Sequence, residues 1–270
     1  MKIAFVKAHG AKNDFLLTWR KDAPEGDAAA MARAICDRHT GVGADGWILV
    51  DKEPQILKEA DAAIQLYNSD GSTAEISGNG TRCAAAFLIR NGLTAGVARI
   101  RTGAGVKTVR LLKRADLKFD FEMNMGQPEI TAPRFELPLG SGPLDVTLVW
   151  IGNPQCAVPV RDFDFDWRAM GAEIESHQHF PNRTNVSFVK PVDEHTIDVR
   201  FYERGAGETM SSGTGSTGAA AAAVSRGMAQ SPVRVLTPAG PLDVRIEGDA
   251  WLTGPAEIVA EGVFFFEARA

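Results

Sequence analysis

The sequence predicts an α+β fold built from two similar halves, each a mixed sheet wrapped around one helix. Three observations support this prediction. The stretch "EISGNGTRCAAAF" (75–87) recurs as "MSSGTGSTGAAAA" (210–222), half of the chain further on. Short alternating stretches typical of strands are frequent, whereas helical stretches are few. The chain has 270 residues, 44% of them apolar, and can therefore bury a sizeable core.

The internal repeat has an offset of 135 residues, which places Ser77 on Ser212. Of the twenty positions in 67–86, seven are identical to their counterparts in 202–221. The stretches "IQLY" (64–67) and "VRFY" (199–202), which precede the two copies, both alternate apolar and polar residues. Each copy therefore predicts a strand, a loop and a helix.

The elements follow from local patterns. β-Branched, alternating stretches predict strands at 2–7, 46–50, 64–67, 106–112, 146–150, 185–189, 196–202, 233–237, 242–246 and 263–267. Residues 28–37 have a helical composition, and the predicted helices at 81–91 and 216–226 end at the glycines Gly92 and Gly227. The segment 114–142 is rich in Pro and Gly and is the expected crossing between the halves.

Composition narrows the range of partners and compartments. The net charge of −5 is spread along the chain without a Lys/Arg cluster, which disfavours nucleic acid and anionic membranes as partners. We expect a small neutral or zwitterionic partner. No stretch has the pattern of a signal peptide or the length of a membrane span. The three cysteines, Cys36, Cys83 and Cys156, are an odd number without metal-ligand spacing. They predict reduced thiols and a cytoplasmic location.

The two Ser-Gly-x-Gly segments are suited to binding anions. Such a turn before a helix presents backbone N–H groups where glycines let a ligand approach, and the helix dipole adds positive potential. If the halves face each other, Ser77 and Ser212 lie on opposite sides of one ligand. That geometry suits the transfer of a proton from one face of a carbon to the other. Ordinary helix capping by serine is the alternative interpretation.

Six polar motifs together resemble one known family. In chain order they are "KAHGAKNDF" (7–15), "DRHTGVGADG" (37–46), "YNSDGSTAEISGNGTRC" (67–83), "GNPQC" (152–156), "TNVSFV" (184–189) and "YERGAGETMSSGTG" (202–215). In order and spacing they resemble the diaminopimelate epimerases. The resemblance covers nearly the whole chain.

The resemblance implies a diaminopimelate-epimerase-like fold, α+β, with two pseudo-symmetric halves, each a mixed barrel-like β-sheet around a central helix. Residues 1–115 and 258–270 are expected to form the N-terminal half and 116–257 the C-terminal half, with the active-site cleft between them. The strand near Val263 is expected to return to the first half. A small-molecule amino-acid substrate is the expected partner, without nucleic acid or membrane, and a homodimer is left open.

The same resemblance implies an isomerase that converts LL- to meso-diaminopimelate, a step of lysine biosynthesis. The reaction needs neither cofactor nor metal, because two residues on opposite faces of the α-carbon transfer the proton. The resemblance assigns these two proton carriers to Ser77 and Ser212, with Gln155 in support. It assigns the substrate contacts to Asn13, Asn68, Asn153, Asn185, Glu203 and Arg204, and the carboxylate-binding backbone to Gly78, Asn79, Gly213 and Thr214.

The sequence departs from the family at the residues that handle protons. The family has cysteines at positions 77 and 212 and histidine at position 155, and it usually has glycine at position 12, where this chain has Lys12. A thiol, with an ordinary pKa near 8.5, ionises readily at a helix N-terminus, whereas a serine hydroxyl needs an adjacent base. Asp70, Glu75 and Glu208 are candidate bases. Cys83 and Cys156 fall where the family often has a noncatalytic cysteine.

Three explanations of the serines are open: engineered substitutions in an ordinary epimerase, a natural branch that isomerises amino acids with serines, or a scaffold that binds an amino acid without catalysis. We adopt the natural branch as our interpretation. The segments "GVGADG" (41–46) and "GTGSTG" (213–218) match the dinucleotide fingerprint in letters only, because the first precedes its strand and the second lacks the acidic residue after the next strand. His177 and His179 in a polar loop are a weak metal motif.

Overall fold

The computed structural model describes residues 1–52 and 59–267. The chain divides into two compact units: unit 1 comprises Met1–Met123 and Gly254–Ala270, and unit 2 comprises Asn124–Thr253. Both boundaries fall inside strands, β8 (Lys118–Gly126) and β17 (Asp249–Phe265). Within the described residues no helix is long and apolar enough to span a bilayer.

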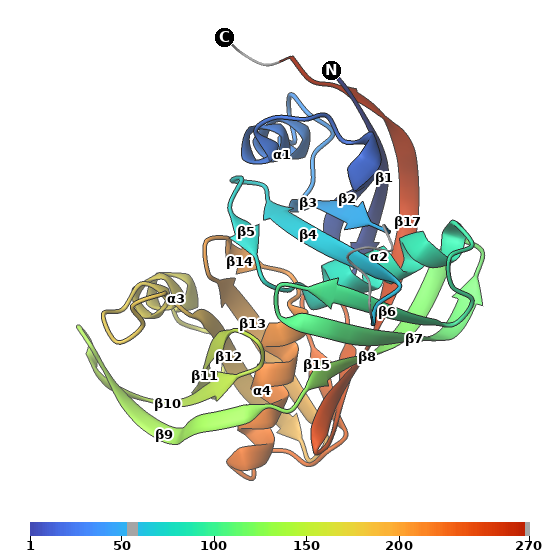
Figure 1. Ribbon diagram of the computed structural model, residues 1–270. Coiled ribbons are helices and arrows are strands. Elements are labelled where there is room, and N and C mark those ends of the chain that lie inside the picture. Colours follow the sequence, from blue (N-terminus) through green and yellow to red (C-terminus); the bar gives the residue numbers. More distant parts are fainter. Residues whose placement is uncertain (53–58, 268–270) are drawn as a thin grey trace. The chain divides into compact units, whose positions relative to one another are not determined.

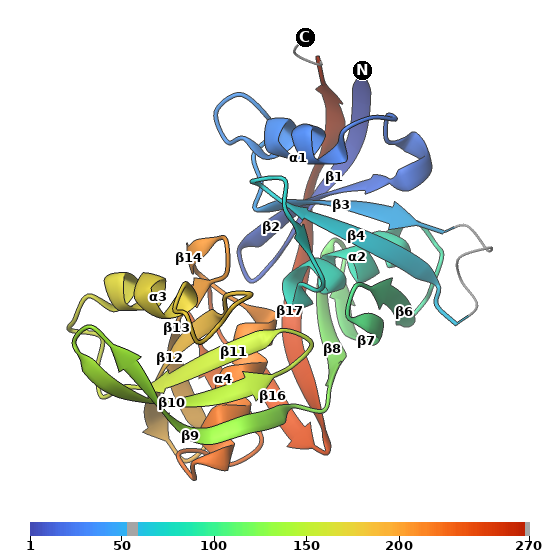
Figure 2. The ribbon, with the colours of Figure 1, turned by 60° about the vertical axis from the view of Figure 1, so that its left-hand side comes forward.

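Unit 1 wraps a mixed sheet around helix α2 (Gly78–Arg90), as Figures 1 and 2 show. Neighbouring strands pair in the order β17–β1–β2–β3–β4–β6–β7–β8, and a β8–β17 pairing closes the ring. The remaining elements are β1 (Lys2–Gly10), β2 (Asn13–Trp19), the 3₁₀ turn η1 (Arg20–Asp22), α1 (Ala28–Cys36), β3 (Gly46–Asp51), β4 (Ala62–Asn68), β5 (Thr73–Ala74), β6 (Val97–Thr102) and β7 (Gly105–Ala115).

Unit 2 wraps its own sheet around helix α4 (Gly213–Ser225), drawn in orange in Figures 1 and 2. Here the pairing order is β9–β10–β11–β12–β13–β15–β16–β17. The elements are β9 (Glu129–Leu139), β10 (Gly142–Trp150), β11 (Pro154–Pro159), α3 (Trp167–Glu175), β12 (Asn185–Asp193), β13 (Thr196–Glu203), β14 (Gly207–Thr209), β15 (Val233–Leu236) and β16 (Leu242–Glu247).

The two units repeat one topology. The pairs β2–β3 and β4–β6 are parallel in unit 1, and their counterparts β11–β12 and β13–β15 are parallel in unit 2. The 135-residue offset holds for the register, since Ala62 pairs with Ile100 and Ile197 pairs with Val235. It also holds for the ends of α2 and α4. The repeat seen in the sequence is therefore a repeat of structure.

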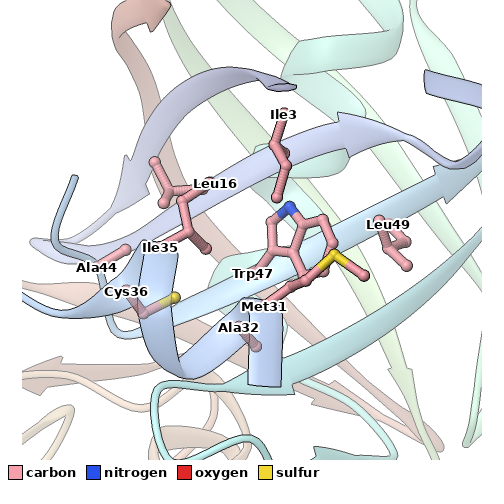
Figure 3. Close-up of a cluster of buried hydrophobic side chains, with 9 residues drawn as sticks. All are labelled: Ile3, Leu16, Met31, Ala32, Ile35, Cys36, Ala44, Trp47 and Leu49. Carbon is pink, nitrogen blue, oxygen red and sulfur yellow. The ribbon is translucent and has the colours of Figure 1, made fainter. Parts of the chain in front are cut away.

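Strand β3 is buried along its whole length because helices pack on both of its faces. In β3, Trp47 and Leu49 face α1, while Ile48 faces α2, where a Cβ on Gly80 would lie 3.1 Å from its Cδ1. The indole N–H of Trp47 donates to Thr18 Oγ1 at 2.9 Å, so this buried donor is satisfied. Figure 3 shows the cluster of Ile3, Leu16, Met31, Ala32, Ile35, Cys36, Ala44, Trp47 and Leu49.

Unit 2 has the corresponding cluster between α3 and its sheet, built from Leu137, Leu139, Val146, Cys156, Val158, Trp167, Ile174, Val186 and Phe188. The C-terminal strand β17 pairs with β1, with Val263 opposite Ala4, so the chain ends in unit 1.

The crossing between the units lies in the segment 114–142, as expected, between Met123 and Asn124. The segment consists largely of the strands β8 and β9, for which the sequence predicted no strand. In β8 alternation buries Phe119 and Phe121, and the prolines of the segment's strands lie in β9, at Pro133 and Pro138. Pro133 is tolerated in β9 because the pairing with β10 skips a residue there, from Phe135–Val146 to Ala132–Leu148.

The expectation that the Ser-Gly-x-Gly segments are loops in front of the helices is wrong. Ser77 and Ser212 are N-caps, and the glycines form the first helical turns. Both helices start three residues earlier than predicted, because the glycines that suggested a loop are required by close packing in the first helical turn. A Cβ on Gly215, for example, would lie 2.9 Å from the Phe201 ring. The strands β2, β6, β11 and helix α3 were not predicted at all.

Candidate functional site

The first turn of α2 carries the predicted residues of unit 1. Ser77 Oγ accepts a hydrogen bond from the Gly80 N–H at 3.1 Å, and the Ser77 carbonyl accepts one from Thr81 Oγ1 at 2.7 Å. Within the described residues no acceptor receives a bond from the Ser77 hydroxyl. Gly78 and Asn79 occupy the next two positions of the helix. The N-terminal end of a buried helix is suited to an anion, since its first N–H groups lack intrahelical acceptors.

Two of the predicted asparagines in unit 1 are joined and one is not. Asn79 Nδ2 donates to Asn13 Oδ1 at 3.2 Å, and Asn13 Nδ2 donates to Asp45 Oδ2 at 2.7 Å. Asn68, at the end of β4, instead bonds within its own turn, with Nδ2 3.0 Å from Ser72 Oγ. The structure therefore brings Asn13 to the first turn of α2 but gives Asn68 a turn-forming role.

The first turn of α4 has the same cap and an additional carboxylate. Ser212 Oγ accepts from the Gly215 N–H at 3.0 Å and donates to Glu203 Oε2 at 2.9 Å. Thr209 Oγ1 donates to the other carboxylate oxygen, Oε1, at 2.6 Å. Glu203 ends β13 and Thr209 ends the adjacent β14, so a strand pair fixes this carboxylate beside the serine. At the 135-residue offset, unit 1 has Asn68 where unit 2 has Glu203.

A second chain of hydrogen bonds reaches the first turn of α4 from β11. Gln155 Nε2 donates to Asn153 Oδ1 at 2.7 Å, and Asn153 Nδ2 donates to Thr214 Oγ1 at 3.3 Å. Gln155 is buried and packs on α4 at Gly218, and its Oε1 has no partner among the described residues. Thr214 follows Gly213, the first residue of α4. Gln155 therefore orients Asn153 and is not itself a proton carrier, because a neutral amide does not titrate.

Asn185 and Arg204 are also joined. Asn185 Oδ1 accepts from the Arg204 N–H at 3.0 Å, and Asn185 Nδ2 donates to the Pro154 carbonyl at 3.1 Å. Arg204 Nη1 lies 3.4 Å from the Asn182 carbonyl. The following turn is held by Glu175 of α3, whose Oε1 accepts from the Gly205 N–H at 3.1 Å. In unit 2 the predicted side chains thus form three hydrogen-bonded groups: Ser212 with Glu203, Gln155 with Asn153 and Thr214, and Asn185 with Arg204. The first two groups include residues of the N-terminal turn of α4.

Two of the three candidate bases named from the sequence, Glu208 and Asp70, are engaged elsewhere. Glu208 forms a two-point ion pair with Arg168, with Nε–Oε2 at 2.5 Å and Nη2–Oε1 at 2.8 Å. Asp70 accepts from the Ser72 N–H and hydroxyl. Burial raises the pKa of the Cys83 thiol to about 12, and burial does the same to Cys156. Neither cysteine therefore supplies a thiolate at neutral pH.

Sequence reasoning missed several residues that support the site. They are Thr209 on Glu203, Glu175 on the Gly205 turn, and Asp45 and Arg82 at the end of the asparagine pair. Arg82 carried a usable signal, because it is a lone charge among the small and apolar residues of "GTRCAAAFLI". Thr209, Glu175 and Asp45 carried none, since their positions depend on which loops meet.

The histidine pair flagged from the sequence has a structural use. His177 Nε2 lies 2.9 Å from the Pro138 carbonyl, and its Nδ1 accepts from the His179 N–H at 3.1 Å. The His179 ring packs on Phe135 with centroids 4.3 Å apart. Among the residues that the structure describes, no group of three or more His, Cys, Asp or Glu could hold a metal ion.

Known proteins resemble this chain in sequence along nearly all of its length. A family model described as diaminopimelate epimerase matches residues 5–131 and 147–259. The diaminopimelate epimerase of Halothermothrix orenii is 35% identical over 97% of this chain and 98% of its own. That of Nitrosospira multiformis is 36% identical with the same coverage, and that of an Azoarcus species is 38% identical.

Solved structures share the fold at low sequence identity. A hydroxyproline epimerase from Agrobacterium vitis has a TM-score of 0.72 and 16% identity, covering 97% of this chain and 92% of that one. A probable proline racemase from Agrobacterium radiobacter has a TM-score of 0.73 and 15% identity, covering 96% and 92%. The fold, α+β with two units that each wrap a mixed sheet around a helix, is that of these epimerases. Together, the family model and the identities of 35–38% show that this chain belongs to the diaminopimelate epimerase family and so to the isomerases.

Proposed function

We propose that the protein is a cofactor-independent amino-acid epimerase that converts LL- to meso-diaminopimelate, the reaction that its relatives' name indicates and that belongs to lysine biosynthesis. Ser77 and Ser212 are its two proton carriers, one from each unit. The observation that carries the proposal is the repeated half-site, in which a serine caps the central helix of both units and accepts a bond from the N–H three residues on. Around it lie the predicted polar side chains.

Ser212 has the groups that a hydroxyl needs to act as a base. Glu203 Oε2 accepts a hydrogen bond from the Ser212 hydroxyl at 2.9 Å. The serine oxygen can therefore take the α-proton of the substrate while the hydroxyl proton moves to the Glu203 carboxylate. Thr209 holds the other carboxylate oxygen and fixes the geometry. The positive end of α4 favours negative charge on the serine oxygen.

Ser77 is equipped differently, because Asn68 stands where unit 2 has its carboxylate. Without a base, the Ser77 hydroxyl is better suited to deliver a proton than to remove one. The positive end of α2 stabilises the oxygen that remains until solvent returns the proton. The asymmetry should appear in α-hydrogen exchange with solvent, which we expect to be faster for the isomer whose α-hydrogen faces Ser212, whereas the rates of inversion in the two directions remain tied by the equilibrium constant.

A binding protein without catalysis is the second candidate. The observation that favours it is the same asymmetry, together with thiols whose pKa burial has raised to about 12. In that case Asn13, Asn153, Asn185 and Arg204 would hold an amino acid whose α-hydrogen never exchanges. Binding and exchange must therefore be measured separately.

The test is deuterium uptake at the α-carbon in heavy water. LL- and meso-diaminopimelate and a panel of other amino acids are incubated with the protein, and incorporation is followed by mass spectrometry and NMR. We expect uptake from diaminopimelate, faster from one isomer, and its loss in Ser212→Ala. Binding by calorimetry without uptake from any amino acid would support the second candidate and refute the first.

A reconstruction experiment tests whether Ser77 and Ser212 are the proton carriers. The triple variant Ser77→Cys, Ser212→Cys, Gln155→His restores the residues that the family has at these positions. We expect it to exchange and invert diaminopimelate faster than the natural chain, because a thiolate forms more readily at a helix N-terminus. The single cysteine variants should gain much less, since inversion needs one carrier for each face. A folded triple variant that binds diaminopimelate without exchange would contradict the assignment.

A further inference from the structure

Arg82 is a buried cation without a carboxylate partner. Its side chain is completely buried in unit 1, and within residues 1–52 and 59–267 it forms no ion pair. Its Nε donates to the Pro255 carbonyl at 3.2 Å, its Nη2 donates to Asn79 Oδ1 at 2.5 Å, and its Nη1 has no partner among these residues. A buried, uncompensated charge is strongly unfavourable, so such a group indicates an anion that the functional state supplies.

The guanidinium points to the first turn of α2 through Asn79, the second residue of that helix. This turn is the one that presents backbone N–H groups to an anion, and α2 is thirteen residues long. Two independent features, a helix N-terminus and a buried cation, therefore act at one place. At the equivalent position of α4 the chain has Thr217, whose hydroxyl bonds to the Gly213 carbonyl of its own helix. Only unit 1 has this charge.

Arg82 also sets the direction of a hydrogen-bond chain. A guanidinium only donates, so Asn79 must turn its oxygen toward Arg82 and its amide nitrogen toward Asn13 Oδ1. Asn13 then turns its own nitrogen toward Asp45 Oδ2, which as a carboxylate only accepts. The donor at one end and the acceptor at the other leave each amide one orientation. Arg38 holds the second oxygen of Asp45 at 2.8 Å.

We infer that Arg82 and Asp45 are positioning residues that commit the N-terminal turn of α2 to a carboxylate: Arg82 supplies the counter-charge, and the pair fixes the orientation of the Asn79 and Asn13 amides. This inference rests on the proposed function for the identity of the substrate. It assigns the substrate's α-carboxylate preferentially to unit 1, because α4 lacks the corresponding charge.

The experiment compares a carboxylate ligand with its neutral counterpart. LL-diaminopimelate, its diamide and acetate are titrated into the ¹⁵N-labelled full-length protein, and the Gly78 and Asn79 amide signals report occupancy of the turn. The variants are Arg82→Lys, Arg82→Gln, Arg82→Met and Asp45→Asn, with Thr217→Val in unit 2 as the matched control. Asp45 is partly exposed, so its variant provides a soluble test if the buried position fails to fold.

Both carboxylate probes are expected to shift the Gly78 and Asn79 signals. Arg82→Gln and Arg82→Met should weaken carboxylate binding by about tenfold or more while leaving the diamide affinity unchanged, since the buried positive charge beside the turn is lost. Arg82→Lys should fall between these variants and the natural protein, Asp45→Asn should weaken carboxylate binding in the same direction, and Thr217→Val should bind normally. A merely structural role would lower both affinities equally.

Several results would overturn the inference: no carboxylate effect on Gly78 and Asn79 in the natural protein, equal carboxylate affinity in Arg82→Met, or an equal loss for the diamide. Failure of the proposed function looks different. A natural protein whose acetate binding depends on Arg82, yet which exchanges no α-hydrogen, would refute the epimerase proposal and leave this inference standing.

Discussion

At the scale of single residues, the acceptor that faces a serine decides what its hydroxyl can do. Ser77 and Ser212 have the same backbone position and accept the same capping bond. Only Ser212 has a carboxylate at 2.9 Å, and that carboxylate is fixed by Thr209. A cysteine would need such help less, because a helix N-terminus alone lowers a thiol pKa. In the proposed mechanism the chemistry of unit 2 therefore depends on Glu203.

Glu203→Gln tests this dependence. The amide keeps the size of the side chain but is a far weaker base, so we expect α-hydrogen exchange to fall by about 10²-fold. The melting temperature should change little, since the amide can accept a hydrogen bond from one of the two hydroxyls and donate one to the other. The matched control is Glu208→Gln, which removes a carboxylate five positions away that pairs with Arg168. Equal exchange rates for Glu203→Gln and the natural protein would remove Glu203 from the mechanism.

Asp14 predicts how unit 1 responds to acid. Burial alone would raise the pKa of this carboxyl, but hydrogen bonds and charges from Arg38 and Lys7 outweigh burial and hold it below its ordinary value of 3.8. A carboxyl with a lowered pKa in the folded state stabilises the fold above about pH 4 and loses that contribution as the pH falls through its folded pKa.

We therefore expect Asp14→Asn to be less stable than the natural protein at pH 7 and to lose less stability between pH 4 and about pH 2. Urea unfolding at several pH values measures both effects. Asp22→Asn, at an exposed aspartate of η1, is the control and should follow the natural protein. Parallel stability curves for Asp14→Asn and the natural protein would show that the ion pairs of Asp14 contribute nothing.

At the scale of elements, each central helix is fitted to its sheet by glycines. A Cβ on Gly218 would lie 2.9 Å from Gln155 Cγ and 3.1 Å from its Cβ. These are atoms close to the β11 backbone, which have little freedom to move. Gln155 in turn orients Asn153. The packing of α4 on β11 therefore also determines the orientation of Asn153 in the site.

Gly218→Ala should lower the free energy of unfolding by about 1–3 kcal/mol through overpacking, partly offset by the better helix propensity of alanine. It should also weaken amino-acid binding, because Asn153 moves with Gln155. Gly96→Ala is the control, since its Cβ would meet nothing within 4 Å. Urea unfolding and calorimetry measure the two effects. A Gly218→Ala variant as stable as Gly96→Ala would show that β11 shifts to accommodate the methyl group with no loss in the free energy of unfolding.

The same packing explains how far the sequence could predict the elements. Alternation identified β4 and β13 because one face of each is partly exposed, and the repeat located both N-caps. Strands such as β11 ("PQCAVP") were missed because burial on both faces removes the alternation. Of the predicted site residues, Asn13, Asn153 and Glu203 bond to the first helical turns or their caps, whereas Asn68 bonds within its own turn and Asn185 and Arg204 bond to each other. Glu175 was missed because its role depends on partners from other loops, whereas Arg82 was missed although its lone charge in an apolar stretch was a usable signal.

At the scale of the whole molecule, one topology is used twice with separate cores. Unit 1 buries Ile35 of α1 against β3, and unit 2 buries Ile174 of α3 against its own strands. Both side chains are fully buried. Within the repeated site segments the two units nevertheless differ in charge: unit 1 has Arg82 and Asn68 where unit 2 has Thr217 and Glu203. The two halves are thus equivalent as folds and different in chemistry.

Separate cores predict separate stability. Ile35→Ala should cost about 2–5 kcal/mol, and amide hydrogen exchange should accelerate mainly in residues 1–123 and 254–267. Ile174→Ala, at the corresponding helix of the other unit, should accelerate exchange mainly in residues 124–253. Exchange followed by mass spectrometry of peptides distinguishes the two patterns. If both variants accelerated exchange equally throughout the chain, the units would unfold as one cooperative body. The strands β8 and β17, which run through both units, would then be what couples them.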